Sequence, residues 1–364
     1  MSLSTGIVGL PNVGKSTLFN AITNSSVEAA NYPFATIEPN VGIVNVPDKR
    51  LDKLAELINP ERVVHNTFKF VDIAGLVKGA SKGEGLGNKF LNNIREVDAI
   101  CHVVRCFENS NITHVHNTVD PIRDLEVINL ELILSDIEVV NSRISRITKK
   151  AQSGDKEAAF EKSVCEKVLD CLTKEKLANT LELSDEEKNV IKSYGLITLK
   201  PMIFVANVSE SDLSNLGQNS HLKKLEEKVG KENIIPLSLK LEEDISKLQD
   251  EDKKEFLEML NISEVGLDKL IMKSYNILGL QTYFTFGKKE VRAWTFKKGM
   301  YAPDCAGIIH SDFKRGFIKA EIINFDDLME YKSEAKVKEM GKMKLVGKDY
   351  VVNDGDICNF KFNV

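Results

Sequence analysis

The chain has 364 residues, enough for two or three domains, and an ordinary globular composition with 42% hydrophobic and 28% charged residues. It contains no apolar run of about 18 residues, and its N-terminus lacks the basic and apolar regions of a signal peptide, so we expect a soluble cytoplasmic protein. The six cysteines include no C-x-x-C pair and lie mostly among apolar neighbours, which favours buried reduced thiols over zinc or disulfides.

The net charge of −5 excludes a globally basic nucleic-acid binder. The charge is unevenly spread, because residues 142–176 and residues 281–364 each carry +3, which leaves −11 on the remainder of the chain. Two mildly basic segments on an acidic body would suit a polyanionic partner, although solvated surface is the simpler explanation for charges of this size.

Short apolar runs rich in β-branched residues recur through the first 206 positions, with helical stretches between most of them. They cover Thr5–Gly9, Gly42–Val46, Thr67–Asp72, Ala99–Val104 and Pro201–Ala206. Runs that are apolar on both faces are typical of strands covered by helices on both sides. We therefore expect an α/β domain with a mostly parallel sheet.

A stretch of 95 residues separates the strand that ends near Arg105 from the next predicted strand, which is several times the length of one crossover helix. Apolar residues from Leu130 to Ile147 recur at three- and four-residue spacing and predict a long amphipathic helix. Gln152-Ser153-Gly154 breaks this pattern, and a second helix is predicted from about 155 to 178. The two form an inserted helical hairpin, followed by a third helix over 184–195 that a capping box opens.

After Gly279 the pattern changes to short strands at Thr282–Phe286, Glu290–Phe296, Phe317–Ile323 and Asp349–Val352, which predict a separate small α+β domain. The expected division is a nucleotide-binding domain over 1–126 and 199–280, the inserted hairpin over 127–198, and the small domain over 281–364.

The segment from Gly9 to Ser16 reads G-x-x-x-x-G-K-S between a predicted strand and a predicted helix. In such a loop, backbone N–H groups surround the phosphates of a nucleotide, Lys15 reaches the β and γ oxygens, and the Ser16 hydroxyl ligates Mg²⁺. Lys15 is thus also a catalytic candidate. The expected nucleotide contacts here are Asn12, Val13, Gly14, Lys15, Ser16 and Thr17.

Asp72 ends an apolar strand and opens a D-x-x-G sequence that finishes at Gly75. After a phosphate loop, this pattern predicts an aspartate that holds Mg²⁺ through water and a glycine N–H that senses the γ-phosphate. Thr36 is the candidate for a second hydroxyl ligand of Mg²⁺, and a plain loop residue is the alternative. The glycine-rich stretch 79–87 does not follow a strand, which favours a switch segment over a dinucleotide fingerprint.

Together, the sequences G-L-P-N-V-G-K-S, N-Y-P-F-A-T, and D-I-A-G-L followed by G-A-S-K-G-E-G-L-G resemble the Obg family of P-loop GTPases, and most closely its YchF subfamily, the Obg-like ATPases. The resemblance covers essentially the whole chain. It implies a hairpin inserted in the nucleotide-binding domain and a C-terminal TGS domain, which is a ubiquitin-like module found in ribosome- and RNA-associated proteins.

Base recognition departs from the GTPase pattern, because Asn207-Val208-Ser209-Glu210 stands where N-K-x-D is usual. The usual Asp accepts two hydrogen bonds from guanine and the Lys stem packs on the base, and Val208 and Glu210 supply neither. Loss of such a bidentate contact costs about 1 to 3 kcal/mol, so we expect guanine discrimination to collapse. The resemblance implies a preference for ATP over GTP, and Ser238 opens an S-L-K sequence similar to the S-A-K loop that contacts the base.

Leu76 stands where many small GTPases place the Gln that orients the attacking water, so another group must do this. His114 and His116 are the candidates, with a solvated loop histidine as the alternative for each. The resemblance favours His114. It also implies that Asn12 helps to bind K⁺.

The leading hypothesis is an ATP-preferring hydrolase that acts as a ribosome-associated switch and uses Mg²⁺. A nucleotide-gated RNA-binding or stress-signalling adaptor and a true GTPase translation factor are the alternatives. Ribosomal RNA is the expected partner, neither a membrane nor DNA is expected, and we expect a monomer.

Overall fold

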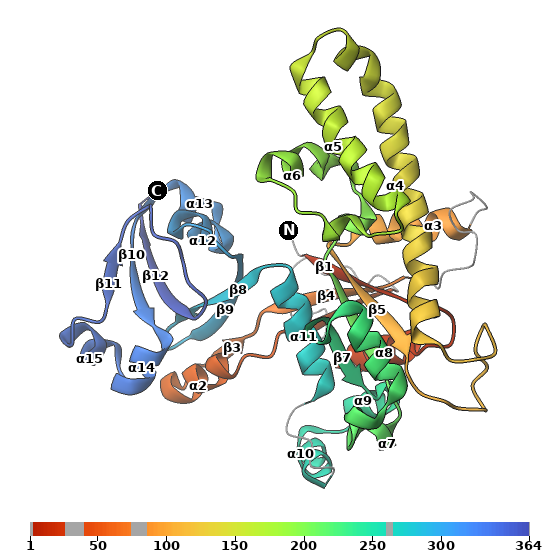
Figure 1. The fold of residues 1–364 in the computed structure, drawn as a ribbon. Coiled ribbons are helices and arrows are strands. Elements are labelled where there is room, and N and C mark those ends of the chain that lie inside the picture. The colour runs from red at the N-terminus through yellow and green to blue at the C-terminus, as the bar shows by residue number, and fades with distance from the viewer. Residues whose placement is uncertain (1–2, 26–39, 74–85, 260–264, 364) are drawn as a thin grey trace. The chain divides into compact units, whose positions relative to one another are not determined.

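The computed structural model describes residues 3–25, 40–73, 86–259 and 265–363 (Figure 1). Contacts within this part of the chain divide it into two units. Unit 1 contains residues 1–43 and 69–270, and unit 2 contains residues 44–68 and 271–364. This division groups residues 44–68 with the C-terminal region, whereas the sequence analysis placed them in the nucleotide-binding domain.

The first sheet has the described strand order β2-β4-β1-β5-β6-β7, with β1 near its centre. All of the pairings recorded for β1 with β4 and β5, for β5 with β6 and for β6 with β7 are parallel, as predicted. The strands are β1 Ser4–Val8, β2 Val41–Asn45, β4 Thr67–Asp72, β5 Ala99–Arg105, β6 Met202–Asn207 and β7 Ile234–Leu237. The four residues of β7 are too few to show a strand pattern in the sequence.

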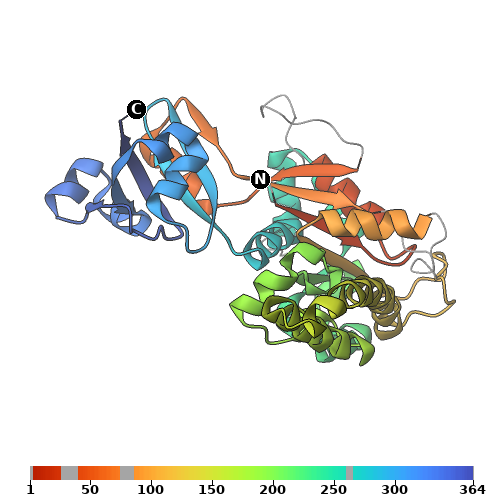
Figure 2. The ribbon, with the colours of Figure 1, turned by 90° about the horizontal axis from the view of Figure 1, so that it is seen from above.

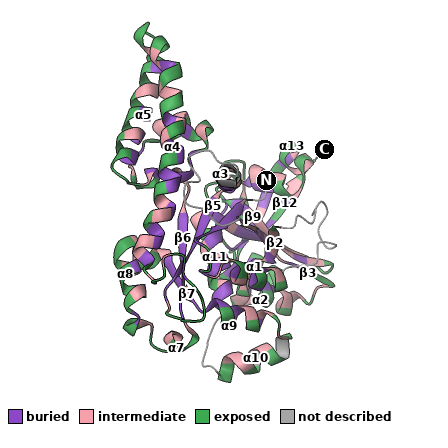
Figure 3. Ribbon diagram, turned by 90° about the vertical axis from the view of Figure 1, so that its right-hand side faces the viewer, coloured by how far each residue is buried: buried purple, intermediate pink, exposed green. Residues whose placement is uncertain are grey.

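Helices connect these strands and cover the sheet. Every residue of β5 and β6 is buried, which explains their continuous apolar sequences, and Figure 3 shows these strands inside unit 1. The helices of unit 1 outside the insertion are α1 Lys15–Asn24, α3 Leu86–Glu96, α7 Glu210–Leu213, α8 Ser220–Val229, α9 Leu239–Ser246 and α10 Asp250–Met259, and α11 Gly266–Ile277 continues into unit 2.

The strand order places the loop after β1 between the carboxyl ends of β4 and β5, because β1 pairs with both strands. Open parallel sheets bind ligands at such an edge, where successive crossovers run in opposite directions. Asp72 ends β4, Arg105 ends β5 and Asn207 ends β6, so three polar residues that are far apart in the sequence reach the same edge.

The inserted hairpin consists of α4 Pro121–Gln152 and α5 Lys156–Thr173, which pack side by side in Figures 1 and 2. Helix α4 begins earlier than its apolar pattern indicated, because Asp120 caps it and Pro121 suits its first turn. Helix α5 ends at Thr173, before the predicted 178. The predicted capping box at Ser184 opens α6 Asp185–Ile191.

Unit 2 contains a second sheet with the described order β11-β10-β12-β8-β9-β3. Its strands are β3 Arg62–Val64, β8 Leu280–Phe286, β9 Glu290–Lys297, β10 Phe317–Asn324, β11 Lys344–Val346 and β12 Asp356–Phe362. Its helices are α2 Lys49–Ile58, α12 Ala302–Ile309, α13 Ser311–Arg315, α14 Phe325–Tyr331 and α15 Glu334–Glu339.

The prediction of a strand at Asp349–Val352 is wrong. Val351 makes only an isolated bridge to Tyr301, and the strands lie on either side, at β11 and β12. Tyr350 instead donates its hydroxyl hydrogen to Asp356, and Val352 is buried in the core of unit 2. Residues 349–352 are therefore an irregular connection between β11 and β12.

The six cysteines are all buried and free, as predicted. No helix in the described part of the chain combines the length and the apolarity that crossing a bilayer requires.

Candidate active site

The phosphate loop joins β1 to α1, as the motif predicted. Gly14 has φ +108°, and a Cβ atom there would lie 2.5 Å from Nδ2 of Asn207. Gly9 has φ +157°, and its Cβ would lie 2.6 Å from the carbonyl oxygen of Val103. Both glycines are therefore required by the backbone conformation and by the close approach of neighbouring strands.

Lys15 is the first residue of α1, and its Nζ donates a hydrogen bond to the carbonyl of Leu10 at 2.8 Å. Burial lowers the pKa of Lys15, an effect that the carboxylate of Asp72 opposes. Burial likewise raises the pKa of Asp72, and the charge of Lys15 opposes that change. The start of α1 and the end of β4 thus hold an ammonium and a carboxylate near each other beside the phosphate loop, with Ser16 exposed at the next position of α1.

Asn207 connects the phosphate loop to the next part of the site. Its Nδ2 donates to the carbonyl of Val13 at 2.9 Å, and its Oδ1 accepts from the N–H of Leu239 at 3.2 Å. Its amide is therefore occupied in fixing the phosphate loop against the start of α9. This explains why an asparagine is needed at the end of β6.

The sequence predicted base contacts at Val208, Glu210 and Ser238, and the structure places all three around one groove of about 1510 Å³ with the phosphate loop. Val208 and Ser238 are buried, and Glu210 is exposed at the start of α7. Of the predicted residues, Asn12, Gly14, Lys15, Ser16, Thr17 and Asn207 also line this groove. The predicted residues Thr36 and Gly75 lie outside the described residues, as does Leu76.

Sequence reasoning named His114 and His116 in the segment that follows β5 but missed four of its residues that line the groove. Phe107, Glu108, Asn109 and Ile112 line the same groove. The only signal available was position, because a segment that follows a central parallel strand emerges at the ligand-binding edge. We call residues 106–120 the β5–α4 loop.

Arg105, the last residue of β5, anchors the β5–α4 loop. This side chain is 1% exposed, and it donates hydrogen bonds to the carbonyls of Phe107, Asn109 and Ile112 at 3.0–3.1 Å. Its guanidinium also lies 4.7 Å from the centre of the Phe107 ring. A buried guanidinium needs several acceptors, and these carbonyls supply them.

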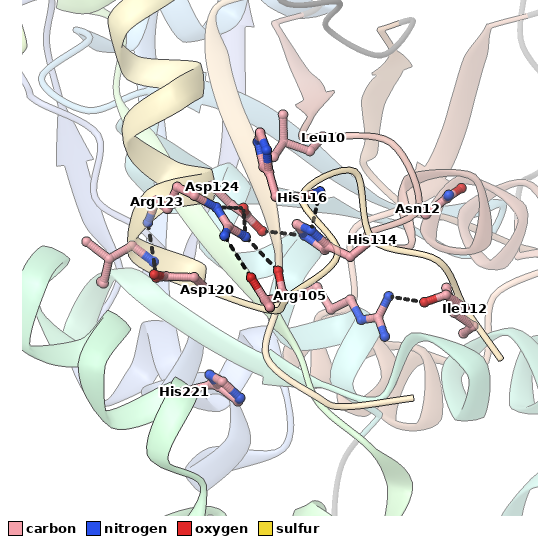
Figure 4. Close-up of polar contacts among 12 residues, drawn as sticks. Leu10, Asn12, Arg105, Ile112, His114, His116, Asp120, Arg123, Asp124 and His221 are labelled. Carbon is pink, nitrogen blue, oxygen red and sulfur yellow. Dashed lines mark hydrogen bonds and ion pairs between the residues drawn. The ribbon is translucent and has the colours of Figure 1, made fainter. Parts of the chain in front are cut away.

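His114 lies in the β5–α4 loop and is buried. Its Nε2 is 2.8 Å from Oδ2 of Asp124, and its Nδ1 accepts the N–H of His116 at 3.1 Å (Figure 4). The preceding residue contacts the phosphate loop, because Nδ2 of Asn12 donates to the carbonyl of Thr113 at 3.1 Å. The structure therefore brings the His114 segment next to the phosphate loop.

The phosphate loop follows a central strand of a parallel sheet, and an aspartate ends the neighbouring strand. The phosphate loop also shares one groove with residues that follow β5, β6 and β7. These features define a P-loop nucleoside triphosphate hydrolase. Family models match residues 4–141, described as "50S ribosome-binding GTPase", and residues 280–363, the C-terminal domain model of YchF GTPases, described as "Protein of unknown function".

"Ribosome-binding ATPase YchF" of Bacillus subtilis is 57% identical to this chain over 366 residues, with 100% of both chains covered. The protein of the same name from Escherichia coli O157:H7 is 53% identical with the same coverage. The structure of the Schizosaccharomyces pombe YchF GTPase is 42% identical, with a TM-score of 0.89, and covers 99% of this chain and 98% of that chain. The chain belongs to the YchF family.

Proposed function

We propose that this protein hydrolyses ATP in preference to GTP and that its nucleotide state controls its association with the ribosome. The base preference rests on the residues between the end of β6 and the start of α7. Val208 is 2% exposed, and its side chain offers no hydrogen-bonding group to a base. The carboxylate of Glu210 is one methylene group further from the backbone than that of the aspartate that binds guanine in GTPases.

The nearest aspartate in this segment cannot replace the missing one. Oδ2 of Asp212 accepts hydrogen bonds from the Ser209 hydroxyl at 2.7 Å, from the Ser209 N–H at 3.2 Å and from Nδ2 of Asn219 at 3.1 Å. These bonds cap α7 and hold the following turn, so this carboxylate is committed to the fold. A groove without a free aspartate at this point does not select guanine through the usual bidentate contact.

Mg²⁺ fits the donors beside the phosphate loop, because a serine hydroxyl and a carboxylate are the hard oxygen ligands that it prefers. Ser16 would bind the ion directly, Asp72 through water, and Thr36 is proposed as the second hydroxyl ligand. The ion would neutralise charge on the β- and γ-phosphates. Nδ2 of Asn12 faces Thr113, which leaves its amide oxygen as the atom that would bind K⁺.

In the hydrolysis step, the oxygen of water bonds to the γ-phosphorus, the bond to the β–γ bridging oxygen breaks, and ADP leaves with that electron pair. The proton that the water loses passes to an oxygen of the transferred phosphate. We propose that Lys15 stabilises the negative charge on the phosphates and that His114 orients the water. The arrangement of His114 one residue from the contact between Asn12 and Thr113 supports this role.

Competitive binding of ATP and GTP to the intact protein tests the base preference. We expect tighter ATP binding, and we expect the double variant Val208→Lys with Glu210→Asp to shift the preference toward GTP by about 1 to 3 kcal/mol. Val208→Leu is the matched control and should keep the parental ratio. A double variant with the parental ratio, or a parental protein that binds GTP more tightly, would contradict the proposal, and the second result would favour a GTPase translation factor.

The names of the bacterial relatives support ribosome association in the cytoplasm. Exposed basic residues near the end of the hairpin include Arg146, Lys149 and Lys150, whereas Arg143 is paired with Glu161 at 2.5 Å. We propose that these exposed charges contact ribosomal RNA. We also propose that residues 281–364 form a TGS domain. The β8–β9 hairpin, the pairing of β10 with β12 and the packing of α12 on β9 and β10 support this.

Co-sedimentation with ribosomes at several salt concentrations, with and without a non-hydrolysable ATP analogue, tests the partner. Binding should weaken as salt rises, and neutralising Arg146, Lys149 and Lys150 together should flatten that dependence. Neutralising Lys174, which pairs with Asp170 at 2.6 Å, is the control and should have little effect. Absence of binding at low salt would contradict the ribosome proposal, whereas unstimulated turnover with nucleotide-dependent RNA binding would favour an adaptor.

A further inference from the structure

The contacts of His114 fix which of its ring nitrogens carries the proton. A backbone N–H can only donate, so Nδ1 of His114, which accepts from the N–H of His116 at 3.1 Å, has no proton. Nε2 therefore carries the proton and donates it to Oδ2 of Asp124 at 2.8 Å. The two side chains, which Figure 4 draws, are only 3% and 2% exposed, which favours a strong bond between them.

Arg123 fixes the orientation of the Asp124 carboxylate. Its Nε and Nη2 lie 3.3 Å and 3.1 Å from Oδ1 of Asp124, on the oxygen that does not face His114. Arg123 is itself held by Thr118, whose hydroxyl and carbonyl oxygens accept from its guanidinium at 3.0 Å and 2.6 Å. The two carboxylate oxygens therefore have separate partners, one for each side.

The fold of the β5–α4 loop does not depend on the His114–Asp124 contact alone. Arg105 already holds three of its carbonyls, and Asn117 closes a turn with its N–H bonded to the carbonyl of His114 at 2.9 Å. The contact with Asp124 thus orients the imidazole ring, whereas other contacts hold the backbone of the loop.

We propose that Asp124 is a positioning residue for hydrolysis, which holds His114 in the tautomer with the proton on Nε2 and so leaves Nδ1 to accept a hydrogen bond from the attacking water. This inference rests on the proposed role of His114. In the structure the N–H of His116 occupies Nδ1 of a buried ring, so the β5–α4 loop would shift before water replaces that N–H. With the opposite tautomer, Nδ1 would carry a proton and could not accept from water.

Asp124→Asn tests this role because Arg123 dictates how the new amide would turn. Its oxygen would face the guanidinium donors, and its NH₂ group would face Nε2 of His114. Nε2 would then have to accept, and the ring proton would move to Nδ1. We expect single-turnover ATP hydrolysis to fall by about 10²-fold or more, as for a misplaced general base, while ATP affinity is retained. Nitrogen-15 NMR of the ring should report a proton on Nδ1.

Asp120→Asn is the matched control. Asp120 caps α4 one turn earlier and does not contact His114, and Asn caps a helix as well as Asp does, so this variant removes the same charge and should keep the parental rate. In a His114→Ala background, Asp124→Asn should cause no further loss of rate, because it acts through the histidine.

The outcomes separate this inference from the proposed function. A slow His114→Ala variant beside an Asp124→Asn variant of normal rate would overturn the role of Asp124 and leave that of His114 intact. A full rate in His114→Ala would overturn both. If Asp124→Asn does not fold, the parental protein still decides, because a ring proton on Nδ1 of His114 in its NMR spectrum would contradict the assigned tautomer.

Discussion

The phosphate loop and the β5–α4 loop lie at the same edge of one sheet and border one groove, but they are built differently. The phosphate loop takes its shape mainly from its own glycines at positions 9 and 14, and one outside side chain, that of Asn207, holds its Val13 carbonyl. The β5–α4 loop is held by side chains on other elements, since Arg105 belongs to β5, Asp124 to α4 and Asn12 to the phosphate loop.

This difference indicates a division of labour. A backbone cradle for phosphates needs fixed N–H groups and tolerates little change, which local glycines and a helix N-terminus provide. A group that orients water need act only when substrate is bound, and a loop held by a few side-chain contacts can rearrange at low cost. The next three predictions probe the two loops and β5, and a last one tests the role of His114.

The largest effect of these three should follow a change in the phosphate loop. Lys15→Ala removes the ammonium directed at the phosphates, and we expect kcat/KM for ATP to fall by about 10²- to 10³-fold, as when a preorganised donor is lost. Circular dichroism should show an unchanged fold, because burial already disfavours the charged form of Lys15. Normal hydrolysis by a folded variant would refute the phosphate-loop assignment.

A smaller effect, on the free energy of unfolding, should follow a change at Arg105, which anchors the β5–α4 loop. Arg105→Lys keeps the charge but loses the planar fork that reaches three carbonyls, and we expect the free energy of unfolding to drop by about 1 to 3 kcal/mol. Urea denaturation measures this. Arg146→Lys, on an exposed position of α4, is the control and should change stability by less than about 0.5 kcal/mol. Equal stabilities for the two variants would contradict the anchoring role.

The third prediction concerns His102 of β5, which pairs with Val8 directly before the phosphate loop. Burial, with a contribution from the charge of Lys15, lowers the pKa of His102 from 6.5 to about 3. The unfolded chain therefore binds one more proton between these pH values, so the free energy of unfolding should decrease as pH falls below 6.5. The slope from this group is about 1.4 kcal/mol per pH unit.

His102→Leu should flatten that dependence by the same amount, which urea denaturation at pH 7, 6 and 5 would detect. His310→Leu provides the control, since His310 is exposed in unit 2. If the free energy of unfolding of the His102 variant depends on pH as it does in the parental protein, the pKa of His102 is not lowered in the folded state.

The sequence allowed the parallel sheet, the hairpin and the phosphate loop to be predicted, because each depends on a local pattern. The strand ends at Asp72 and Asn207 followed from the same patterns, and both reach the expected edge. The short strands β3 and β7 could not be found this way, because three or four residues carry no periodicity.

Contacts between distant residues were also not predictable. The pairing of His114 with Asp124 depends on how the loop returns over the start of α4, and neither residue type signals it. The role of Arg105 is similar, because a single arginine at a strand end gives no indication that it bonds to three carbonyls of the loop that follows. Tertiary structure supplies this part of the site.

The central claim is that the β5–α4 loop supplies the group that orients water, through His114. Single-turnover hydrolysis of bound ATP by His114→Ala, with ATP affinity measured in parallel, tests it most directly. His116→Ala is the matched control, because it keeps the backbone N–H that contacts His114. We predict a loss of about 10²- to 10⁴-fold in the rate with ATP affinity retained. A full rate in His114→Ala, or an equal loss in both variants, would contradict the claim.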